Sequence, residues 1–530
     1  MNFIWNLPLF TIVLSLFSGP LCTMLKAKAA KYYTLFLECS LIFMTTLVFW
    51  YTLHTRKAFT YSMGEFPAPW GNEIRAGTLE ALIALLFLVV LLCSNLAGWH
   101  FLKIDIDESK INLYYSLLNL LTAALMALVW TNDIFTGYVF LEILTLTSCG
   151  ILIVREIGRT TLAAVRYMIL NLLGSGLYLL GVVLLYNLTG QLLMVPMQET
   201  LAVITENGAG MPAVSLSIGI LTIGLGIKSG LFPFHFWMPD TYGWATPTSA
   251  SVLSSLVSKA YIFLLIKVYY RAIGIGVIAR TPILKILFVL GICGIIFGSV
   301  SAIRANNIDR MVAFSSAAQI GYIYMGIGMG STAALTAALF QIMTHAVTKS
   351  LLFLTTPYLA EVSGDSLLFK KLQGSGHRNR MAGFFFTIGA LSMVGIPVFG
   401  GFSMKLLFAQ SAVLETSVRK MMMVMLALAV SSLLNVLYFI RTLVRIFTEP
   451  SQETEKASAA AGPEDGAVEG AKAAAAEKEC VPGTARQEEM EIERLSYGTA
   501  GMILTAANVV LGLFSWVVVD LISRGLSMFS

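Results

Sequence analysis

Apolar runs of about 20 residues recur along nearly the whole 530-residue chain, and this repetition limits the fold more than any other feature. Each run is long enough to cross a bilayer core of roughly 30 Å as an α-helix. Hydrophobic residues make up 57% of the chain and charged residues 12%, whereas a soluble domain is about a quarter charged. The surplus of apolar side chains has to face lipid. The sequence therefore predicts an all-α polytopic membrane protein.

The apolar runs predict about 14 membrane-spanning helices in five regions. We expect N-terminal helices 1–3 in residues 1–111, a first group of five helices in 112–275, a second group in 276–447, a flexible cytoplasmic loop in 448–496 and a last helix in 497–530. The predicted spans are 3–22, 32–53, 78–99, 112–130, 133–153, 163–187, 211–231, 246–270, 281–303, 310–329, 332–358, 382–412, 420–447 and 498–523.

The distribution of lysine and arginine predicts the orientation in the membrane. The odd-numbered loops carry most of the basic residues that lie between spans, among them Lys26, Arg155, Arg304, Lys370 and Arg441. Cytoplasmic loops carry this excess of positive charge. We therefore expect a multi-pass protein of the cytoplasmic (inner) membrane with both termini on the extracytoplasmic side. Residues 450–490, rich in Ala, Glu, Gly and Lys, cannot bury enough apolar surface to offset ordering.

The seventh and twelfth spans are each interrupted by residues that break helices. Pro233 splits the seventh span, and Pro397, Gly400 and Gly401 split the twelfth. Proline removes a backbone donor and glycine relaxes the helix. Broken helices in corresponding positions favour two structural repeats, spans 4–8 and 9–13, with an ion path near the membrane midplane.

Several ionisable side chains lie inside the predicted spans, where a charge costs about 2.5–3.5 kcal/mol on insertion scales. They are Glu142 in the fifth span, Lys228 in the seventh, Lys259 in the eighth, His345 and Lys349 in the eleventh and Lys405 in the twelfth. His345 and Lys349 share one helix face because they are four residues apart. Glu80 and Lys267 lie near span ends, and we expect them to extend to the interface.

A lysine next to a carboxylate suits ion transfer because the pair can store and release energy. A buried lysine without hydration releases its proton near neutral pH, and a nearby carboxylate opposes that release. At about 4 Å and an effective dielectric near 20 the pair contributes roughly 4 kcal/mol. Moving one charge against about 150 mV costs roughly 3.5 kcal/mol. Opening one ion pair is therefore of the right size to drive one proton uphill.

No cofactor motif accompanies these residues. The six cysteines are scattered without CxxC or metal-ligand spacing, so we interpret them as small residues within helices. The net charge of +5 is small and forms no nucleic-acid patch. The N-terminal run lacks a basic n-region and a cleavage site, which favours a retained first helix. We expect no metal and no cofactor in this chain, and no electron transfer by the chain itself.

Five segments resemble those of the antiporter-like, proton-translocating subunits of respiratory complex I, Mrp antiporters and membrane-bound hydrogenases. The segments are NDIFTGYVFLEIL, GIKSGLFPFHFWMPDTYGWATPTSA, NNIDRMVAFSSAAQIG, FQIMTHAVTKSLLF and GIPVFGGFSMKLLF. They occur in the family's order between about residues 112 and 450. Lys259 after LSSLVS looks more like the Mrp and hydrogenase branch, and the whole chain looks most like a D-type Mrp subunit.

The resemblance implies a fold of 14 helices with two inverted five-helix repeats and broken helices 7 and 12. It implies that Glu142 and Lys228 form a regulatory ion pair and that Lys259 is the central proton carrier. His345 and Lys349 would connect Lys259 to Lys405, the candidate exit lysine. Departures from the family pattern include Gln341 and Thr348, which imply a differently hydrated second half-channel.

We expect the chain to translocate protons as a subunit of a multisubunit, NADH:quinone oxidoreductase-like or hydrogenase-like complex. Its partners would be other membrane subunits, and redox cofactors would lie in those partners. The alternative is the D-type subunit of an Mrp-type sodium/proton antiporter without redox partners. A non-conducting scaffold is a third interpretation, which the retained Lys228 and Lys405 disfavour, and a self-contained solute transporter is less favoured still.

Overall fold

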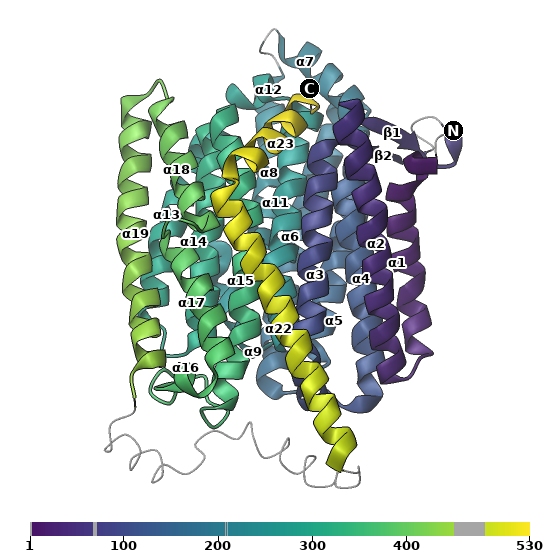
Figure 1. Cartoon of the computed structure of the whole chain (residues 1–530). Helices are drawn as coiled ribbons and strands as arrows, with labels where there is room; N and C mark the ends of the chain where they lie inside the picture. Colours follow the sequence, from purple (N-terminus) through teal and green to yellow (C-terminus); the bar gives the residue numbers. More distant parts are fainter. Residues whose placement is uncertain (1–2, 67–70, 207, 209, 450–482, 530) are drawn as a thin grey trace.

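The chain folds into a bundle of long helices, with both termini at the same end (Figure 1). The computed structural model describes residues 3–66, 71–206, 208, 210–449 and 483–529. Most of the predicted cytoplasmic loop, residues 450–482, lies outside the described residues. The prediction of an all-α polytopic membrane protein is confirmed for the described part of the chain.

The N-terminal part adds a short hairpin to the expected helices. Its strands pair antiparallel, with Thr60 opposite Arg75, and they are too short to leave an alternating pattern in the sequence. The elements are η1 (Phe3–Asn6), α1 (Leu7–Thr23), α2 (Ala27–Thr55), β1 (Phe59–Ser62), η2 (Met63–Glu65), β2 (Glu73–Ala76) and α3 (Thr78–Asp105).

The next part of the chain holds the first predicted five-helix group and the short helices α7 and α12 at the end of the bundle that carries the termini (Figure 1). Its elements are η3 (Glu108–Lys110), α4 (Ile111–Trp130), α5 (Ile134–Ile153), α6 (Gly158–Thr189), α7 (Met194–Glu206), α8 (Met211–Ser229), η4 (Phe234–Trp237), α9 (Met238–Trp244), α10 (Pro247–Val252), the π-helical turn η5 (Leu253–Val257), α11 (Ser258–Lys267), the π-helical turn η6 (Val268–Ile273) and α12 (Ile275–Ala279).

In the C-terminal part, α22 (Gly483–Leu513) crosses one face of the bundle and packs against α3, α15, α17 and α18 (Figure 1). The elements are α13 (Ile283–Arg304), α14 (Ile308–Met329), α15 (Thr332–Glu361), α16 (Ser375–Arg378), α17 (Arg380–Val394), α18 (Gly400–Val413), α19 (Val418–Phe447), α22 (Gly483–Leu513) and α23 (Ser515–Ser527).

The predicted C-terminal helix starts earlier and is divided in two: α22 begins at Gly483 instead of residue 497, and α23 follows it from Ser515. The segment that precedes residue 497 is rich in Glu and Arg, which are good helix formers. Glu493 also binds His100 and Lys103 of α3, which anchors this part of α22. A low content of apolar residues is therefore compatible with a flexible loop and equally with a polar extension of a helix, and it does not distinguish the two.

Twelve helices among the described residues are long and apolar enough to cross a membrane, against about 14 predicted spans. The other two predicted spans correspond to α14, which carries polar residues along its length, and to the pair α17 and α18, which are each too short alone. The relation of residues 112–275 and 276–447 as inverted repeats stays a prediction.

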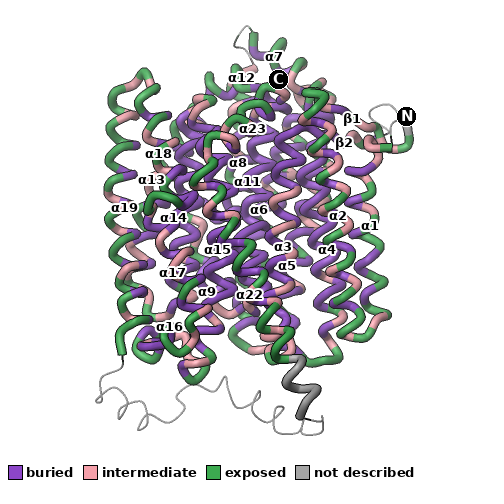
Figure 2. Tube along the Cα trace, viewed as in Figure 1, coloured by how far each residue is buried: buried purple, intermediate pink, exposed green. Residues whose placement is uncertain are grey.

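The core of the bundle lies along α10, α11 and α15, which are buried except near their ends, while the outer helices expose much of their surface (Figure 2). The outer helices α1, α2 and α19 present large apolar side chains outward, among them Phe17, Phe36 and Leu426. Such surfaces suit a hydrocarbon environment. Many polar and ionisable side chains are buried inside the bundle, among them Lys228, Lys259 and Lys349.

Candidate functional site

Glu142 and Lys228 lie together where α5 meets α8. Lys228 Nζ is 3.8 Å from Glu142 Oε2, and Lys228 is fully buried whereas Glu142 is partly exposed. Ser175 of α6 donates a hydrogen bond to the same carboxylate oxygen. Lys228 occupies the last turn of α8, and Gly230 ends that helix with a φ of 78°. The structure therefore brings together the predicted pair at the end of an interrupted helix.

Thr145 connects this pair to the centre of the bundle. Lys228 Nζ donates a 2.5 Å hydrogen bond to Thr145 Oγ1, and Thr145 Oγ1 lies 3.2 Å from the hydroxyl of Tyr261 on α11. Lys228 Nζ also lies 5.3 Å from the centre of the Tyr261 ring. Sequence analysis missed both residues, although Thr145 follows Glu142 by three positions and so shares its helix face.

Lys259 binds a carbonyl that a π-helical turn makes available. Its Nζ donates to the backbone oxygen of Ser254, five residues earlier, and to Ser258 Oγ at 3.2 Å. Ser254 belongs to η5, and π-helical segments are frequent at functional sites. Within the described residues Lys259 forms no ion pair with a carboxylate, and its hydrogen-bond partners are neutral oxygens.

Serine hydroxyls lie between Lys259 and Lys349. Ser254 Oγ is 3.0 Å from Ser316 Oγ on α14, and the neighbouring Ser315 accepts a hydrogen bond from Lys349. Lys349 Nζ also donates to the Val312 carbonyl oxygen at 2.9 Å. The two lysines therefore face each other across one helix lined with hydroxyl groups.

His345 lies one turn before Lys349 on α15 and is buried. Neither of its ring nitrogens has a hydrogen-bond partner within the described part of the chain. Its position is close enough to Lys259 and Lys349 for their charges to interact.

Lys405 binds the C-terminal end of α17. The helix α17 ends at Val394, and Gly395 follows with a φ of 91°. Lys405 Nζ, from α18, donates a 2.6 Å hydrogen bond to the Val394 carbonyl oxygen. Because α17 ends at Val394, the carbonyl oxygen of Val394 can accept this hydrogen bond from Lys405.

A buried polar bridge that sequence analysis missed joins α15, α17 and α22 near this second break. Asn508 Nδ2 donates to Thr348 Oγ1 at 2.8 Å, and Ser392 Oγ donates to Asn508 Oδ1 at 2.9 Å. Asn508 Oδ1 also accepts from the backbone N–H of Gly400, the first residue of α18. Asn508 lies in an apolar run far from the matched motifs, so no local signal identified it.

A buried carboxylate in α2 also escaped the sequence analysis. Glu38 is almost fully buried, and Asn95 of α3 donates to both of its carboxylate oxygens at 3.2 and 3.4 Å. Its position in the middle of an apolar run gives the same signal that identified Glu142. The N-terminal helices therefore carry an ionisable group of their own.

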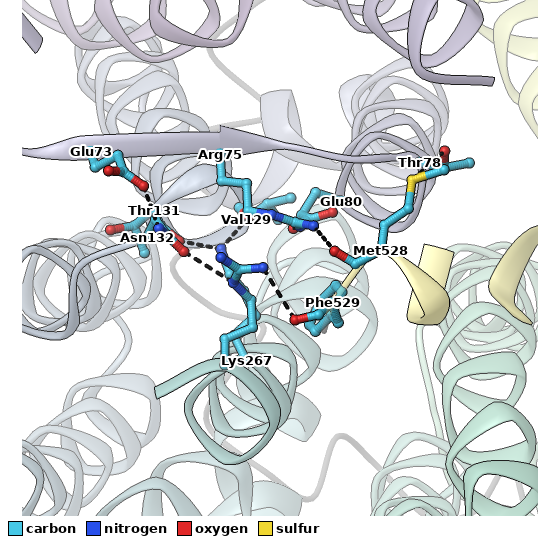
Figure 3. Close-up of polar contacts among 11 residues, drawn as sticks. Glu73, Arg75, Thr78, Glu80, Val129, Thr131, Asn132, Lys267, Met528 and Phe529 are labelled. Carbon is cyan, nitrogen blue, oxygen red and sulfur yellow. Dashed lines mark hydrogen bonds and ion pairs between the residues drawn. The ribbon is translucent and has the colours of Figure 1, made fainter. Parts of the chain in front are cut away.

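The prediction that Glu80 and Lys267 extend to the interface is wrong. Both are completely buried, in a cluster of charged residues that also includes Arg75 and contacts Met528 near the C-terminus (Figure 3). Arg75 donates to Glu80, and Lys267 donates to the Val129 and Thr131 carbonyl oxygens that end α4. The hairpin, the α4–α5 turn and the C-terminal residues cover this end of the bundle, so neither side chain has a path to water.

The same cluster holds the C-terminal residues in place. Arg75 donates to the Met528 carbonyl oxygen, and Arg271 donates to that of Phe529 at 3.4 Å (Figure 3). Arg271 also binds Asn132 Oδ1 at 3.0 Å, and Asn132 Nδ2 donates to Glu73 at 2.5 Å. Because its contacts join the ends of several elements, we interpret the cluster as structural.

The predicted site residues thus form three local groups. Glu142 and Lys228 form the first, Lys259, His345 and Lys349 the second, and Lys405 the third. No hydrogen bond within the described residues joins Tyr261 to Lys259 or Lys349 to Lys405. The arrangement can hold protons at successive buried basic groups, and transfer between the groups requires water or side-chain motion.

Comparison with known proteins gives consistent matches. The family described as "NADH:quinone oxidoreductase/Mrp antiporter, TM" matches residues 131–435. The chain is 30% identical over 448 residues to the N-type subunit of NADH-quinone oxidoreductase from Desulforudis audaxviator (strain MP104C), covering 83% of this chain and 86% of that relative. It is 28% identical over 408 residues to the D-type subunit of the Na(+)/H(+) antiporter from Bacillus subtilis (strain 168), covering 76% and 79%. In the solved Mrp complex from Dietzia sp. DQ12-45-1b, one chain shares the fold with a TM-score of 0.82 at 19% identity, covering 99% of this chain and 97% of that one.

Proposed function

This chain belongs to the NADH:quinone oxidoreductase/Mrp antiporter family, and from that premise we propose that it carries protons across the cytoplasmic membrane as an antiporter-like subunit of a multisubunit complex. The ion pair between Lys228 and Glu142 at an interrupted helix carries the proposal. The NADH-quinone oxidoreductase subunit among the relatives supports a redox-driven host complex. Flavin, iron–sulfur or nickel–iron centres would then lie in partner subunits.

The proposed path runs from the first group to the third. Glu142 sets the charge of Lys228, and Thr145 and Tyr261 lead toward Lys259. Lys259 exchanges a proton with Lys349 and His345 through the serines of α14, and Lys405 releases it. Both termini would lie on the extracytoplasmic side, because the basic loops gather at the other end of the bundle.

The second candidate function is that of the D-type subunit in a sodium/proton antiporter. The match to the Bacillus subtilis antiporter protein supports it. In that case a sodium gradient would drive proton movement along the same path, and no redox partner would be present. The residues of the site are the same in both candidate functions, so the partners distinguish them.

Purification of the tagged full chain in mild detergent tests the proposal. We expect other membrane subunits to copurify, and the reconstituted complex to acidify or alkalinise vesicles when it is given an electron donor. Copurified redox subunits would support the first candidate, and sodium-driven proton movement without redox subunits would support the second. A complex that moves protons under neither condition would contradict both.

Thr145→Val should slow proton movement about tenfold, because it removes a hydrogen bond to a charged group that contributes about 1.5–3 kcal/mol. The measurement is proton uptake by vesicles that contain the assembled complex. Thr147→Val is the matched control, since Thr147 bonds only carbonyl groups of its own helix. A Thr145→Val rate equal to that of the control would remove Thr145 from the path.

A further inference from the structure

A cavity of about 490 Å³, lined by both polar and apolar side chains, opens at the end of the bundle opposite the termini, among α3, α15, α16, α17 and α22. Its lining includes three exposed arginines, Arg378, Arg380 and Arg494. The first turn of α17 also lines the cavity, and the N-terminus of a helix carries positive potential. None of the path residues contributes to it.

The cavity has an excess of positive charge. Its two carboxylates, Glu361 and Glu493, are both bound by His100, at 3.3 and 2.8 Å, and Glu493 is also bound by Lys103. Arg378 donates only to the Ser363 hydroxyl and the Gln373 carbonyl. None of the three arginines forms an ion pair within the described residues, so the cavity favours an anion.

An apolar hollow of about 770 Å³ continues from this cavity along α22. The two share Met381, Met490 and Arg494, and the hollow extends to Met502. Eight residues of helix separate Arg494 from Met502, which is about 12 Å along the axis. Leu495 and Met502 are exposed apolar residues on this face, which belongs to a candidate membrane span. A charged end and an apolar extension of this length match an amphiphilic ligand.

We propose that the two hollows together bind one anionic phospholipid. Its phosphate lies against Arg378, Arg380, Arg494 and the first turn of α17, and one acyl chain lies along the surface from Met381 to Met502. Basic pockets between membrane helices on the cytoplasmic side bind such headgroups. The apolar hollow favours a lipid over a free phosphate ion, because an inorganic ion would use only the polar part.

Thermal unfolding of the purified full chain, titrated with phosphatidylglycerol or phosphatidylcholine in mixed micelles, tests this assignment. We expect phosphatidylglycerol to raise the midpoint temperature and phosphatidylcholine to leave it unchanged. The triple variant Arg378→Gln, Arg380→Gln, Arg494→Gln should bind phosphatidylglycerol about a hundredfold more weakly. Native mass spectrometry should find retained anionic lipid on the natural chain and not on this variant.

Arg304→Gln, Arg419→Gln, Arg441→Gln is the matched control, because these three exposed arginines lie outside the cavity and form no ion pair within the described residues. Gly498→Leu tests the apolar part, since a Cβ at this glycine would already lie 3.3 Å from Met381 Sδ. It should weaken binding of long-chain but not of short-chain phosphatidylglycerol. Equal responses to both lipids, equal losses in both triple variants, or full stabilisation by inorganic phosphate alone would overturn the proposal.

Discussion

Lys228→Ala should reduce proton movement by the assembled complex about a hundredfold, to the background of empty vesicles. The substitution removes the amine that pairs with Glu142 at 3.8 Å, that donates a hydrogen bond to Thr145, and that carries a proton in the proposed path. Losing a positioned proton donor typically costs 10²- to 10⁴-fold in rate. Dye-monitored proton uptake in vesicles measures the effect, with the amount of assembled complex determined in parallel.

Lys228→Arg separates transport from structure at the same position. Arginine keeps the positive charge and the ion pair but does not release its proton in proteins. We therefore expect this variant to assemble normally and to transport as poorly as Lys228→Ala. Lys285→Ala, at an exposed position of α13, serves as the control. Normal transport by Lys228→Arg would mean that the pair with Glu142 is structural.

Glu80→Gln should destabilise the chain by about 3–5 kcal/mol, the usual effect of removing one partner from a buried ion pair. Glu80 lies near Arg75, Lys267 and Arg271, and among the described residues it is the only fully buried carboxylate close to them. Its loss therefore leaves three basic side chains without a buried carboxylate to balance their charge. The expected result is a lower free energy of unfolding in a denaturant titration of the detergent-solubilised chain.

Glu73→Gln controls for this effect, because Glu73 is partly exposed and binds only Asn132 in the same cluster. We expect Glu73→Gln to lower the free energy of unfolding by less than about 1 kcal/mol. The double variant Arg75→Met, Glu80→Leu should lower the free energy of unfolding by less than the sum of the two single substitutions. Each single substitution leaves one buried charge of the pair unopposed, whereas the double variant removes both charges. A Glu80→Gln chain as stable as the Glu73→Gln chain would contradict the proposed role of the cluster.

Much of the fold and of the site could be predicted because membrane insertion makes certain residues conspicuous. Apolar runs had to be helices, since backbone groups in lipid need internal partners. Glu142, Lys228, Lys259, His345, Lys349 and Lys405 stood out because a charge in such a run is costly. The structure places Glu142 beside Lys228 and gathers Lys259, His345 and Lys349, as expected. Their roles in transport stay predictions.

The ends of α8 and α17 show what a local sequence pattern can predict and what it cannot. Proline and glycine in the seventh and twelfth spans predicted interruptions, which stay predictions as features of membrane helices; α8 ends at Ser229 and α17 at Val394, each before a glycine. The sequence could not predict that Lys405 binds the freed Val394 carbonyl, or that a π-helical turn offers the Ser254 carbonyl to Lys259. Both contacts depend on the path of the backbone in space.

The sequence by itself determined the class of the protein, its spans, its family and the chemical types along the path, because composition, run length and motifs are local properties. The tertiary structure alone decided what covers each charge. Glu80 and Lys267 occupy positions typical of interfacial residues, yet the hairpin and the C-terminal residues exclude water from them. Asn508 and Arg494 acquire their roles from neighbours distant in the chain. Whether a polar group is exposed, paired or enclosed is set by the other elements packed around it, and no local pattern records those elements.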